Sequence, residues 1–436
     1  LNVQVLTERL QMSNYAITQA SSGQEALELI QKGFRPDLVL LDVMMPRMSG
    51  YEVARRLREQ FAANEMPIVM LSAKNQLSDL AIGLESGAND YLTKPVSREE
   101  LLARLKTHLQ LSNLNVAYGR FIPREFLEML NKDSIVDVTL GDRTKRTMSV
   151  LFSDIRGYTT LSEAMTPEEN FQFINAYLAE MEDAISGNNG FIDKYIGDAI
   201  MALFDRPADS ALKAAIAMLH SLDQYNQQRA KQHGEPIRIG IGIDTGPLML
   251  GTVGGRQRLD TTVIGDAVNL ASRLENLTKF YGTPLLISHR VLAALEEPEQ
   301  FSIRFLDRIS VRGRTKPVAI YEVINADPDP IRENKLRTAG RFEEGILLFH
   351  RRQYVEAAGR FEDCLQDSPG DRVIQIYLER AVRLGFPPTE QSWRLVNGRV
   401  VNKHRRYWSL NRWTLSNPPS DTPPPPDFGF PQEEHS

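Results

Sequence analysis

The order of strand-like and helix-like segments changes near residue 110, and this change restricts the possible folds more than any other feature. From 1 to about 110, short apolar runs such as "DLVLLDVMMP" and "MPIVMLSA" alternate with helix-like segments at 23–33, 50–61 and 76–87. Such alternation predicts a parallel, doubly wound α/β sheet. From about 146 to 325, strands and helices are mixed without a regular βαβ order, which predicts an α+β sandwich. The chain therefore contains at least two domains.

The 436 residues are 42% hydrophobic and 25% charged, a globular composition with enough apolar side chains for two or three cores. A net charge of −5 gives no general attraction for nucleic acid, so no nucleic-acid partner is expected. The single cysteine, Cys364, excludes an internal disulfide framework and fits a reducing cytoplasm. No apolar run approaches the roughly 20 residues of a membrane span, and no signal sequence opens the chain, so a cytoplasmic protein is expected.

Three polar residues of the first domain lie next to its predicted strands. Asp42 closes the strand in "LVLLD", Ser72 ends the strand in "VMLS", and Lys94 precedes Pro95 in "YLTKP". Loop polarity or helix capping would explain each of them alone. Because ligand sites of parallel sheets gather at the carboxyl ends of the strands, the three together indicate a site.

With these residues, the segment 1–110 resembles the receiver domain of response regulators. The resemblance implies that Asp42 is the phosphoacceptor, that Lys94 contacts the phosphoryl group, and that Ser72 and Tyr91 are the hydroxyl and aromatic switch residues. It also implies an upstream histidine kinase or phosphorelay protein as a partner. Receivers begin with a strand followed by an acidic pair that holds a divalent cation, and this chain starts later. We therefore expect a receiver domain that lacks its first strand, and a natural protein that extends further upstream.

Two aspartates of the second domain lie where apolar strands turn. Asp154 ends the strand of "MSVLFSDIRGYT", and Asp198 lies in the Gly-Asp turn of the hairpin "FIDKYIGDAIMALF". Two carboxylates on adjacent strand ends are what a pair of Mg²⁺ ions about 4 Å apart would need. The backbone N–H groups of Ile155, Arg156 and Gly157 turn into a helix and suit an anionic ligand. Alone, either aspartate would be interpreted as a helix cap or a turn residue.

A second pair of polar residues lies on a predicted helix. Asn269 and Arg273 are four residues apart in "AVNLASRLE" and therefore share one helix face. An arginine can bind a phosphate and an asparagine can hydrogen-bond a sugar, although a solvated helix face explains both residues as well. The preceding "GIGIDTG" is not a dinucleotide-binding fingerprint, because its glycines alternate within a strand and do not open a helix.

Together with "VRGRTKPVAIYEV", these motifs follow the order seen in class III nucleotide cyclases, and residues 146–325 resemble the catalytic domain of that family. The resemblance implies conversion of ATP to 3′,5′-cyclic AMP and pyrophosphate. It also implies two Mg²⁺ or Mn²⁺ ions per active site, held by Asp154, Ile155 and Asp198. In this family the metal aspartates and the Asn/Arg pair of one site come from opposite protomers, so a homodimer is expected.

The same resemblance assigns the substrate contacts. Lys194 and Thr262 match the two base-selecting positions, and the pair favours ATP because guanylate cyclases carry glutamate and typically cysteine there. Many adenylate cyclases have aspartate at the second position, and the threonine is similar to a bacterial subgroup associated with bicarbonate stimulation. Asn269 matches the residue that orients the ribose, and Arg273 the residue that neutralises charge on the α-phosphate. Arg312 matches a basic residue for the terminal phosphates, with Arg314 as a nearby alternative.

Three further segments complete the expected organisation. Residues 111–145 are expected to be a helical linker, and the apolar stripe at 97–118 fits equally a coiled coil and a helix packed on its own domain. Residues 335–385 resemble a single tetratricopeptide unit, and the proline-rich segment 386–436 is expected to be largely disordered.

A function from another class stays open beside the cyclase. In that alternative, the chain is a non-catalytic response-regulator scaffold whose degenerate cyclase-like domain binds a nucleotide or a partner. The sequence favours the enzyme, because every matched position keeps a chemically competent residue.

Overall fold

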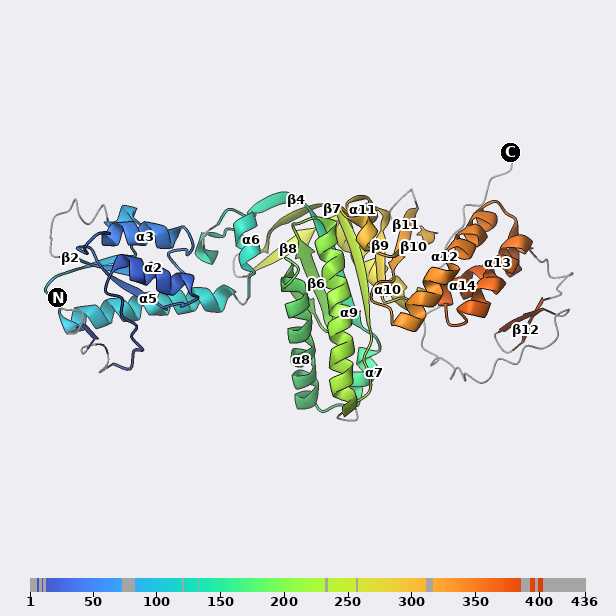
Figure 1. The fold of residues 1–436 in the computed structure, drawn as a ribbon, viewed down its shortest axis with the longest axis horizontal. Coiled ribbons are helices and arrows are strands. Elements are labelled where there is room, and N and C mark those ends of the chain that lie inside the picture. The colour runs from blue at the N-terminus through green and yellow to red at the C-terminus, as the bar shows by residue number, and fades with distance from the viewer. Residues whose placement is uncertain are drawn as a thin grey trace. The chain divides into compact units, whose positions relative to one another are not determined.

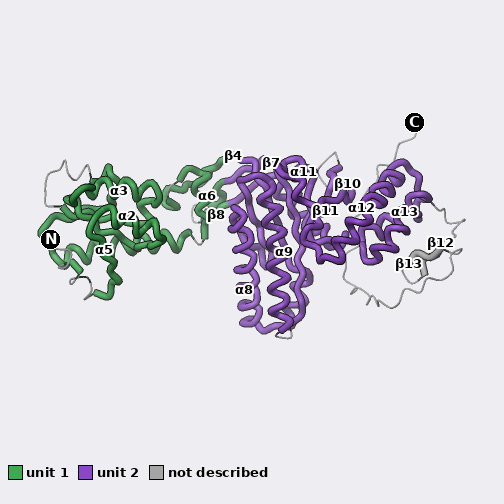
Figure 2. The backbone as a smooth tube through the Cα atoms, viewed as in Figure 1, with its two compact units in different colours: residues 1–144, 251–261 green, residues 145–250, 262–436 purple. Residues whose placement is uncertain are grey.

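A computed structural model describes most of the chain. The described residues are 6–7, 10, 13–72, 83–119, 121–132, 134–231, 234–255, 258–310, 317–385, 393–396 and 399–402. They form two compact units, one of residues 1–144 with 251–261 and one of residues 145–250 with 262–436 (Figure 2). Each unit is described separately below as the N-terminal and the C-terminal unit.

The N-terminal unit is built on a parallel three-stranded sheet in the order β1-β2-β3. Its strands and helices are β1 (Val39–Asp42), β2 (Ile68–Ser72), β3 (Asp90–Thr93), α2 (Gly23–Gln31), α3 (Gly50–Arg58) and α5 (Arg98–Gly119). Ile68 and Met70 of β2 pack in the cluster that contains α2 and α3, whereas Val69 and Leu71 pack with α5. Helices therefore cover both faces of the sheet (Figure 1), which confirms the predicted doubly wound fold.

The apolar stripe of helix α5 was compatible with a coiled coil or with packing on its own domain, and the structure distinguishes the two for the first half of the helix. Leu101 and Leu105 are buried in the core of the N-terminal unit, so this half packs on its own domain. Further along, Val116 is 55% exposed. The linker region continues with α6 (Arg124–Met129) and the 3-10 turn η1 (Ile135–Asp137). Most of the helix expected at 76–87 lies outside the described residues.

The C-terminal unit contains a mixed sheet in the order β10-β11-β9-β7-β4-β6-β5, with β8 paired to β7. The strands are β4 (Arg143–Ile155), β5 (Phe191–Ile196), β6 (Ala199–Phe204), β7 (Ile239–Gly254), β8 (Leu259–Ile264), β9 (Leu285–Ser288), β10 (Ile303–Ile309) and β11 (Val318–Val323). The helices and turns before the tail are α7 (Tyr158–Glu163), α8 (Pro167–Ser186), α9 (Ala208–Lys231), α10 (Asp266–Tyr281), α11 (His289–Ala293) and η2 (Pro298–Gln300). The predicted hairpin at 191–204 is confirmed, since β5 and β6 pair in antiparallel order.

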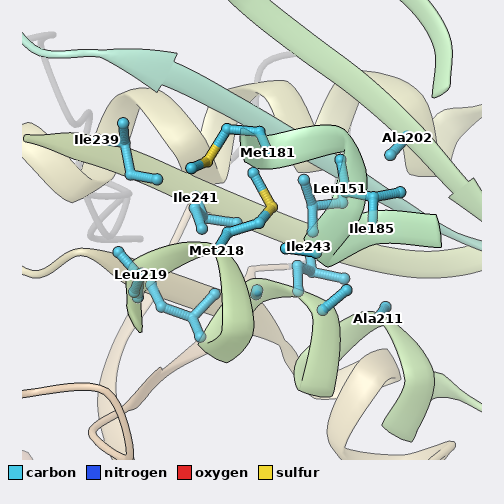
Figure 3. Close-up of a cluster of buried hydrophobic side chains, with 14 of the residues drawn as sticks. Leu151, Met181, Ile185, Ala202, Ala211, Met218, Leu219, Ile239, Ile241 and Ile243 are labelled. Atoms are coloured by element: carbon cyan, nitrogen blue, oxygen red, sulfur yellow. The ribbon is translucent and has the colours of Figure 1, made fainter. Parts of the chain in front are cut away.

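Helices lie on both faces of this sheet. Helices α8 and α9 run side by side (Figure 1) and bury one face, with Met181 and Met218 reaching the isoleucines of β7 (Figure 3). The short strand β9 shows the alternation of a two-sided core, because Leu285 and Ile287 pack toward α8 and α9 while Leu286 packs toward α10. All three side chains are fully buried.

The start of α8 follows directly from its sequence. The Thr166 side chain accepts a hydrogen bond from the Glu169 N–H, and the Glu169 carboxylate accepts one from the Thr166 N–H at 2.9 Å. Pro167 occupies the first helical position, where a missing N–H costs nothing. This capping box is the one that the pattern Thr166-Pro167-x-Glu169 predicts.

Three helices follow the sheet and pack against it. They are α12 (Asp329–His350), α13 (Tyr354–Asp367) and α14 (Arg372–Gly385), and we call them the helical tail. Phe342, Phe361 and Tyr377 of the tail share one core with Leu270 and Leu274 of α10. The tail is therefore part of the C-terminal unit. The strands β12 (Trp393–Val396) and β13 (Arg399–Asn402) form a hairpin within the segment expected to be largely disordered.

Candidate active site

The two aspartates predicted to bind metal lie at the ends of neighbouring strands. Asp154 is near the end of β4, and Asp198 occupies the turn between β5 and β6. Strands β4 and β6 pair in antiparallel order with Ser153 opposite Ile200, which places the end of β4 beside this turn. The Ile155 N–H donates a hydrogen bond to Asp198 Oδ2 at 3.2 Å. The structure therefore brings Asp154, Ile155 and Asp198 together.

The electrostatics of this pair suit a cation. Burial and the nearby charge of Asp154 raise the pKa of Asp198 to about 6. A divalent cation would relieve the repulsion between the carboxylates, and hard oxygen donors are the ligands that Mg²⁺ prefers. In the described part of the chain no group of three or more His, Cys, Asp or Glu side chains forms a metal site. A metal here would rest on two carboxylates, with backbone oxygens, water or substrate completing its shell.

Two backbone N–H groups of the turn after Asp154 donate hydrogen bonds within the chain. The Ile155 N–H is bonded to Asp198, and the Arg156 N–H donates to the Arg238 carbonyl oxygen at 2.8 Å. Gly157 has a φ of 71°, a left-handed conformation that favours glycine, and it precedes α7. A phosphate contact through the N–H groups of Ile155 or Arg156 would therefore require these bonds to open, and the role of Gly157 stays a prediction.

Helix α10 presents Asn269 and Arg273 on an exposed face and packs its other face on β7. Close packing is possible because β7 has glycine at the contact. A Cβ added to Gly242 would lie 2.1 Å from the Glu275 backbone nitrogen and 2.4 Å from the Ala271 carbonyl oxygen. The alternating glycines of "GIGID" are thus explained by helix-to-strand packing.

Arg156, which was assigned to the substrate through its backbone N–H, lies beside this contact between α10 and β7. The Arg156 guanidinium donates from Nη1 to Glu275 Oε1 at 2.9 Å and from Nη2 to the Glu275 carbonyl oxygen at 3.1 Å. Burial raises the pKa of Glu275 to about 7 against the influence of Arg156, and the charges of Asp154 and Asp198 add to the rise. The side chain of Arg156 is therefore engaged within its own chain.

The predicted base-selecting residues lie on two strands, Lys194 on β5 and Thr262 on β8. Lys194 Nζ lies 3.4 Å from Asp193 Oδ2, and the side chain of Asp193 is only 1% exposed. Burial raises the pKa of Asp193, with Lys194 opposing the rise. A β-bulge between Ile192 and Lys194 displaces the regular alternation at this point. Arg312 and Arg314 lie outside the described residues.

In the N-terminal unit, the predicted phosphorylation site is assembled at the carboxyl ends of the strands. Lys94 Nζ forms an ion pair with Asp42 Oδ2, while the Met44 N–H donates to Asp42 Oδ1 at 3.1 Å. Ser72 ends β2 and is 2% exposed. Tyr91 lies on β3, and its buried hydroxyl has no hydrogen-bond partner in the described part of the structure. The structure therefore brings Asp42 and Lys94 together, and the roles of all four residues stay predictions.

Two residues of the catalytic region were missed by sequence reasoning. Asp193 was passed over as the residue before Lys194, because neighbouring residues of a regular strand point to opposite faces and the sequence does not show the β-bulge at this point. Glu275 was passed over because a glutamate two residues after Arg273 looks like part of a solvated helix face. Its burial depends on the glycines of β7, which a helix periodicity alone does not reveal.

Family comparisons agree with both regions. The family described as "Response regulator receiver domain" matches residues 1–106, and "Adenylate and Guanylate cyclase catalytic domain" matches residues 141–325. An "Adenylate cyclase" of Anabaena cylindrica is 45% identical over 247 residues, which is 55% of this chain and 49% of that protein. "Adenylate cyclase, terminal-differentiation specific" of Dictyostelium discoideum is 35% identical over 280 residues, 63% of this chain and 13% of that protein.

Two further similarities concern single regions of the chain. "Response regulator MprA" of Mycolicibacterium vanbaalenii is 40% identical over 138 residues, 32% of this chain and 58% of that protein. The solved structure of the adenylyl cyclase CyaB from P. aeruginosa is 35% identical, covers 43% of this chain and 98% of that chain, and has a TM-score of 0.39.

The chain spans about half the length of the Anabaena relative and a smaller share of the Dictyostelium one. Among the described residues, no helix combines the length and the apolar character needed to cross a membrane. Both domain matches coincide with the folds and with the paired carboxylates seen above. Residues 1–106 are therefore a response regulator receiver domain, and residues 141–325 belong to the adenylate and guanylate cyclase catalytic family.

Proposed function

We propose that this chain is an adenylate cyclase that converts ATP to 3′,5′-cyclic AMP and pyrophosphate. The observation that carries the proposal is the carboxylate pair Asp154 and Asp198. Burial and the nearby charge of Asp154 raise the pKa of Asp198 to about 6, and a divalent cation would relieve the repulsion between the two carboxylates. The family match at 141–325 and the relatives named adenylate cyclase support the same reaction.

In this proposal Asp154, Ile155 and Asp198 hold two Mg²⁺ or Mn²⁺ ions. When bound, the ions would lower the pKa of the ribose 3′-hydroxyl and bind phosphate oxygens. Asn269 orients the ribose and Arg273 neutralises charge that develops on the α-phosphate, from the exposed face of α10. These exposed positions suit a homodimer in which each site combines the aspartates of one chain with α10 of its partner.

The receiver domain supplies the proposed regulation. We place phosphorylation at Asp42, with an upstream histidine kinase or phosphorelay protein as donor, because Lys94 already neutralises one oxygen of this carboxylate. A cytoplasmic location fits the single cysteine, Cys364, which is buried and free.

The reaction is tested with purified protein incubated with Mg²⁺ or Mn²⁺ and, separately, with ATP and GTP. We expect cyclic AMP and pyrophosphate from ATP in equal amounts. Absence of a cyclic product from either nucleotide, in a preparation confirmed to be dimeric, would overturn the proposal in favour of a nucleotide-binding scaffold.

Base selection is tested with Lys194→Glu combined with Thr262→Cys. We expect the preference for ATP over GTP to fall by about 10- to 100-fold, because a donor to the adenine ring is replaced by an acceptor. Competition between the two nucleotides, followed by separate measurement of both cyclic products, gives the ratio. An unchanged ATP preference in the double variant would leave Lys194 as an ordinary strand lysine.

A further inference from the structure

The two halves of the catalytic machinery carried by one chain are joined by the Arg156–Glu275 ion pair. Arg156 follows the metal-site residue Asp154 by two positions, and Glu275 follows Arg273 by two positions on α10. The guanidinium donates to Glu275 Oε1 at 2.9 Å and to the Glu275 carbonyl oxygen at 3.1 Å. The arginine is thus bonded to both the side chain and the backbone of the helix.

Packing holds this pair in one place. The side chains of Arg156 and Glu275 are 20% and 7% exposed. A Cβ added to Gly240 would lie 1.5 Å from Arg156 Nη2, so the space above this glycine is filled by the guanidinium. The Arg156 N–H also donates to the Arg238 carbonyl oxygen at 2.8 Å. A movement of the turn 154–157 therefore requires a movement of Glu275, of β7, or of both.

One of these bonds is charge-assisted and the other goes to the backbone, and two bonds from a planar guanidinium fix its orientation. An arginine side chain that binds phosphate would have its guanidinium directed at the substrate and not at a helix of its own chain. We infer that Arg156 and Glu275 are positioning residues that hold the metal carboxylates and the Asn269/Arg273 helix at a set spacing. In the proposed homodimer these two halves serve different active sites, so the pair also links one site to the other. The inference rests on the proposed function.

The first experiment compares Glu275→Gln, Arg156→Lys and the double variant, with Glu344→Gln as the control. Glu344 pairs with Arg360 at 3.0 Å on the exposed surface of the helical tail, so its loss should leave activity unchanged. We expect each single variant to lower kcat by about 10- to 100-fold, as loss of a supporting partner does at metal sites, and the double variant to fall no further. Equal losses of kcat in the two single variants, with no further loss in the double variant, would show that Arg156 and Glu275 act together.

A different pattern overturns the inference. If Arg156→Lys loses activity while Glu275→Gln keeps the wild-type kcat and KM, the arginine acts directly on substrate. Thermal unfolding checks that each variant is folded, and Glu275→Asp, which keeps the charge, replaces Glu275→Gln if that variant is unfolded. We expect Glu275→Asp to recover part of the lost kcat.

A mixed dimer tests the link between sites. One chain carries Asp198→Ala and its partner carries Arg273→Ala, so the sole intact site combines the aspartates of the second chain with α10 of the first. Adding Glu275→Gln to the second chain leaves every substrate-facing residue of that site unchanged. We expect its activity to fall by the same 10- to 100-fold, because Arg156 beside the aspartates loses its support. Unchanged activity would overturn the inference.

Binding of Mn²⁺ alone, followed by electron paramagnetic resonance without nucleotide, separates this inference from the proposed function. Glu275→Gln should weaken Mn²⁺ binding about 10-fold or more, whether or not the wild-type protein makes a cyclic product. If wild-type and Glu275→Gln proteins bind Mn²⁺ equally, the positioning role is wrong. If the wild type binds Mn²⁺ and makes no product, the proposed reaction alone is wrong.

Discussion

Two clusters of charge in the C-terminal unit differ in how well their carboxylates are paired with cations. The catalytic cluster contains one cation, Arg156, and three carboxylates, Asp154, Asp198 and Glu275. The junction cluster joins the sheet to the helical tail and contains two cations and three carboxylates. Its members are Arg304, Lys335, Glu322, Asp327 and Asp371.

The junction cluster is well paired. Arg304 donates to Glu322 at 3.0 Å and to Asp371 at 2.6 Å, and Lys335 donates to Asp327 at 2.7 Å. Burial opposes ionisation of Glu322, yet Arg304 and Lys335 hold its pKa below the usual value. In the catalytic cluster the pKa of Asp198 moves upward. In the junction cluster the buried carboxylates are paired with cations, and such pairs hold the helices in place. In the catalytic cluster the carboxylates outnumber the one cation, so a metal ion could bind there.

The largest effect is expected from a substitution that removes a carboxylate of the catalytic cluster. Asp198→Ala should lower turnover of ATP by at least about 10³-fold, because a metal supplies several kcal/mol of transition-state stabilisation. The free energy of unfolding without metal should change little, since removal of a repelled carboxylate offsets the loss of the acceptor for the Ile155 N–H. Cyclic AMP formation and urea unfolding measure the two quantities, with the exposed Asp205→Ala as control. Substantial remaining activity would show that Asp198 holds no essential metal.

Breaking the junction cluster should have the reverse outcome. Glu322→Ala leaves Arg304 and Lys335 buried without their shared partner, and we expect a loss of about 3–5 kcal/mol in the free energy of unfolding. Glu344→Ala, which breaks an exposed ion pair with Arg360, should cost at most about 1 kcal/mol. Denaturant unfolding measures both. Similar small losses for the two variants would mean that the junction cluster does not hold the tail.

The smallest expected effect is a pH dependence. The folded pKa of Asp198, about 6, lies above its ordinary value of 3.8, so its contribution to stability is complete below pH 4 and is lost as the pH rises through 6. Compared with Asp198→Asn, metal-free wild-type protein should lose about 1 kcal/mol across this range, after allowance for solvent screening. Saturating Mg²⁺ should abolish the difference.

Unfolding curves between pH 4 and 8, with and without Mg²⁺, measure this dependence. Parallel pH profiles for the two proteins without metal would mean that Asp198 is not held in a proton-retaining environment, and the contrast with Glu322 would then lose its basis.

The position of the two aspartates of the catalytic cluster was predictable from the sequence. Asp154 and Asp198 each end or interrupt an apolar strand, and strand ends that pair bring such residues together whatever the rest of the fold does. The capping box at Thr166 and the hairpin at 191–204 were predictable for the same reason, since each depends on neighbouring residues. The junction cluster was not predictable, because Arg304 and Asp371 are 67 residues apart.

The sequence by itself therefore determined the two domain types, the helices and strands with strong local signals, and the carboxylates suited to a metal. Tertiary structure decided which charges are compensated. Arg156 was assigned to the substrate through its backbone N–H, and its guanidinium is bonded to Glu275 because glycines in β7 let α10 approach closely. Local patterns record periodicity and turns, whereas the pairing and pKa of a buried charge depend on distant segments that meet only in the folded chain.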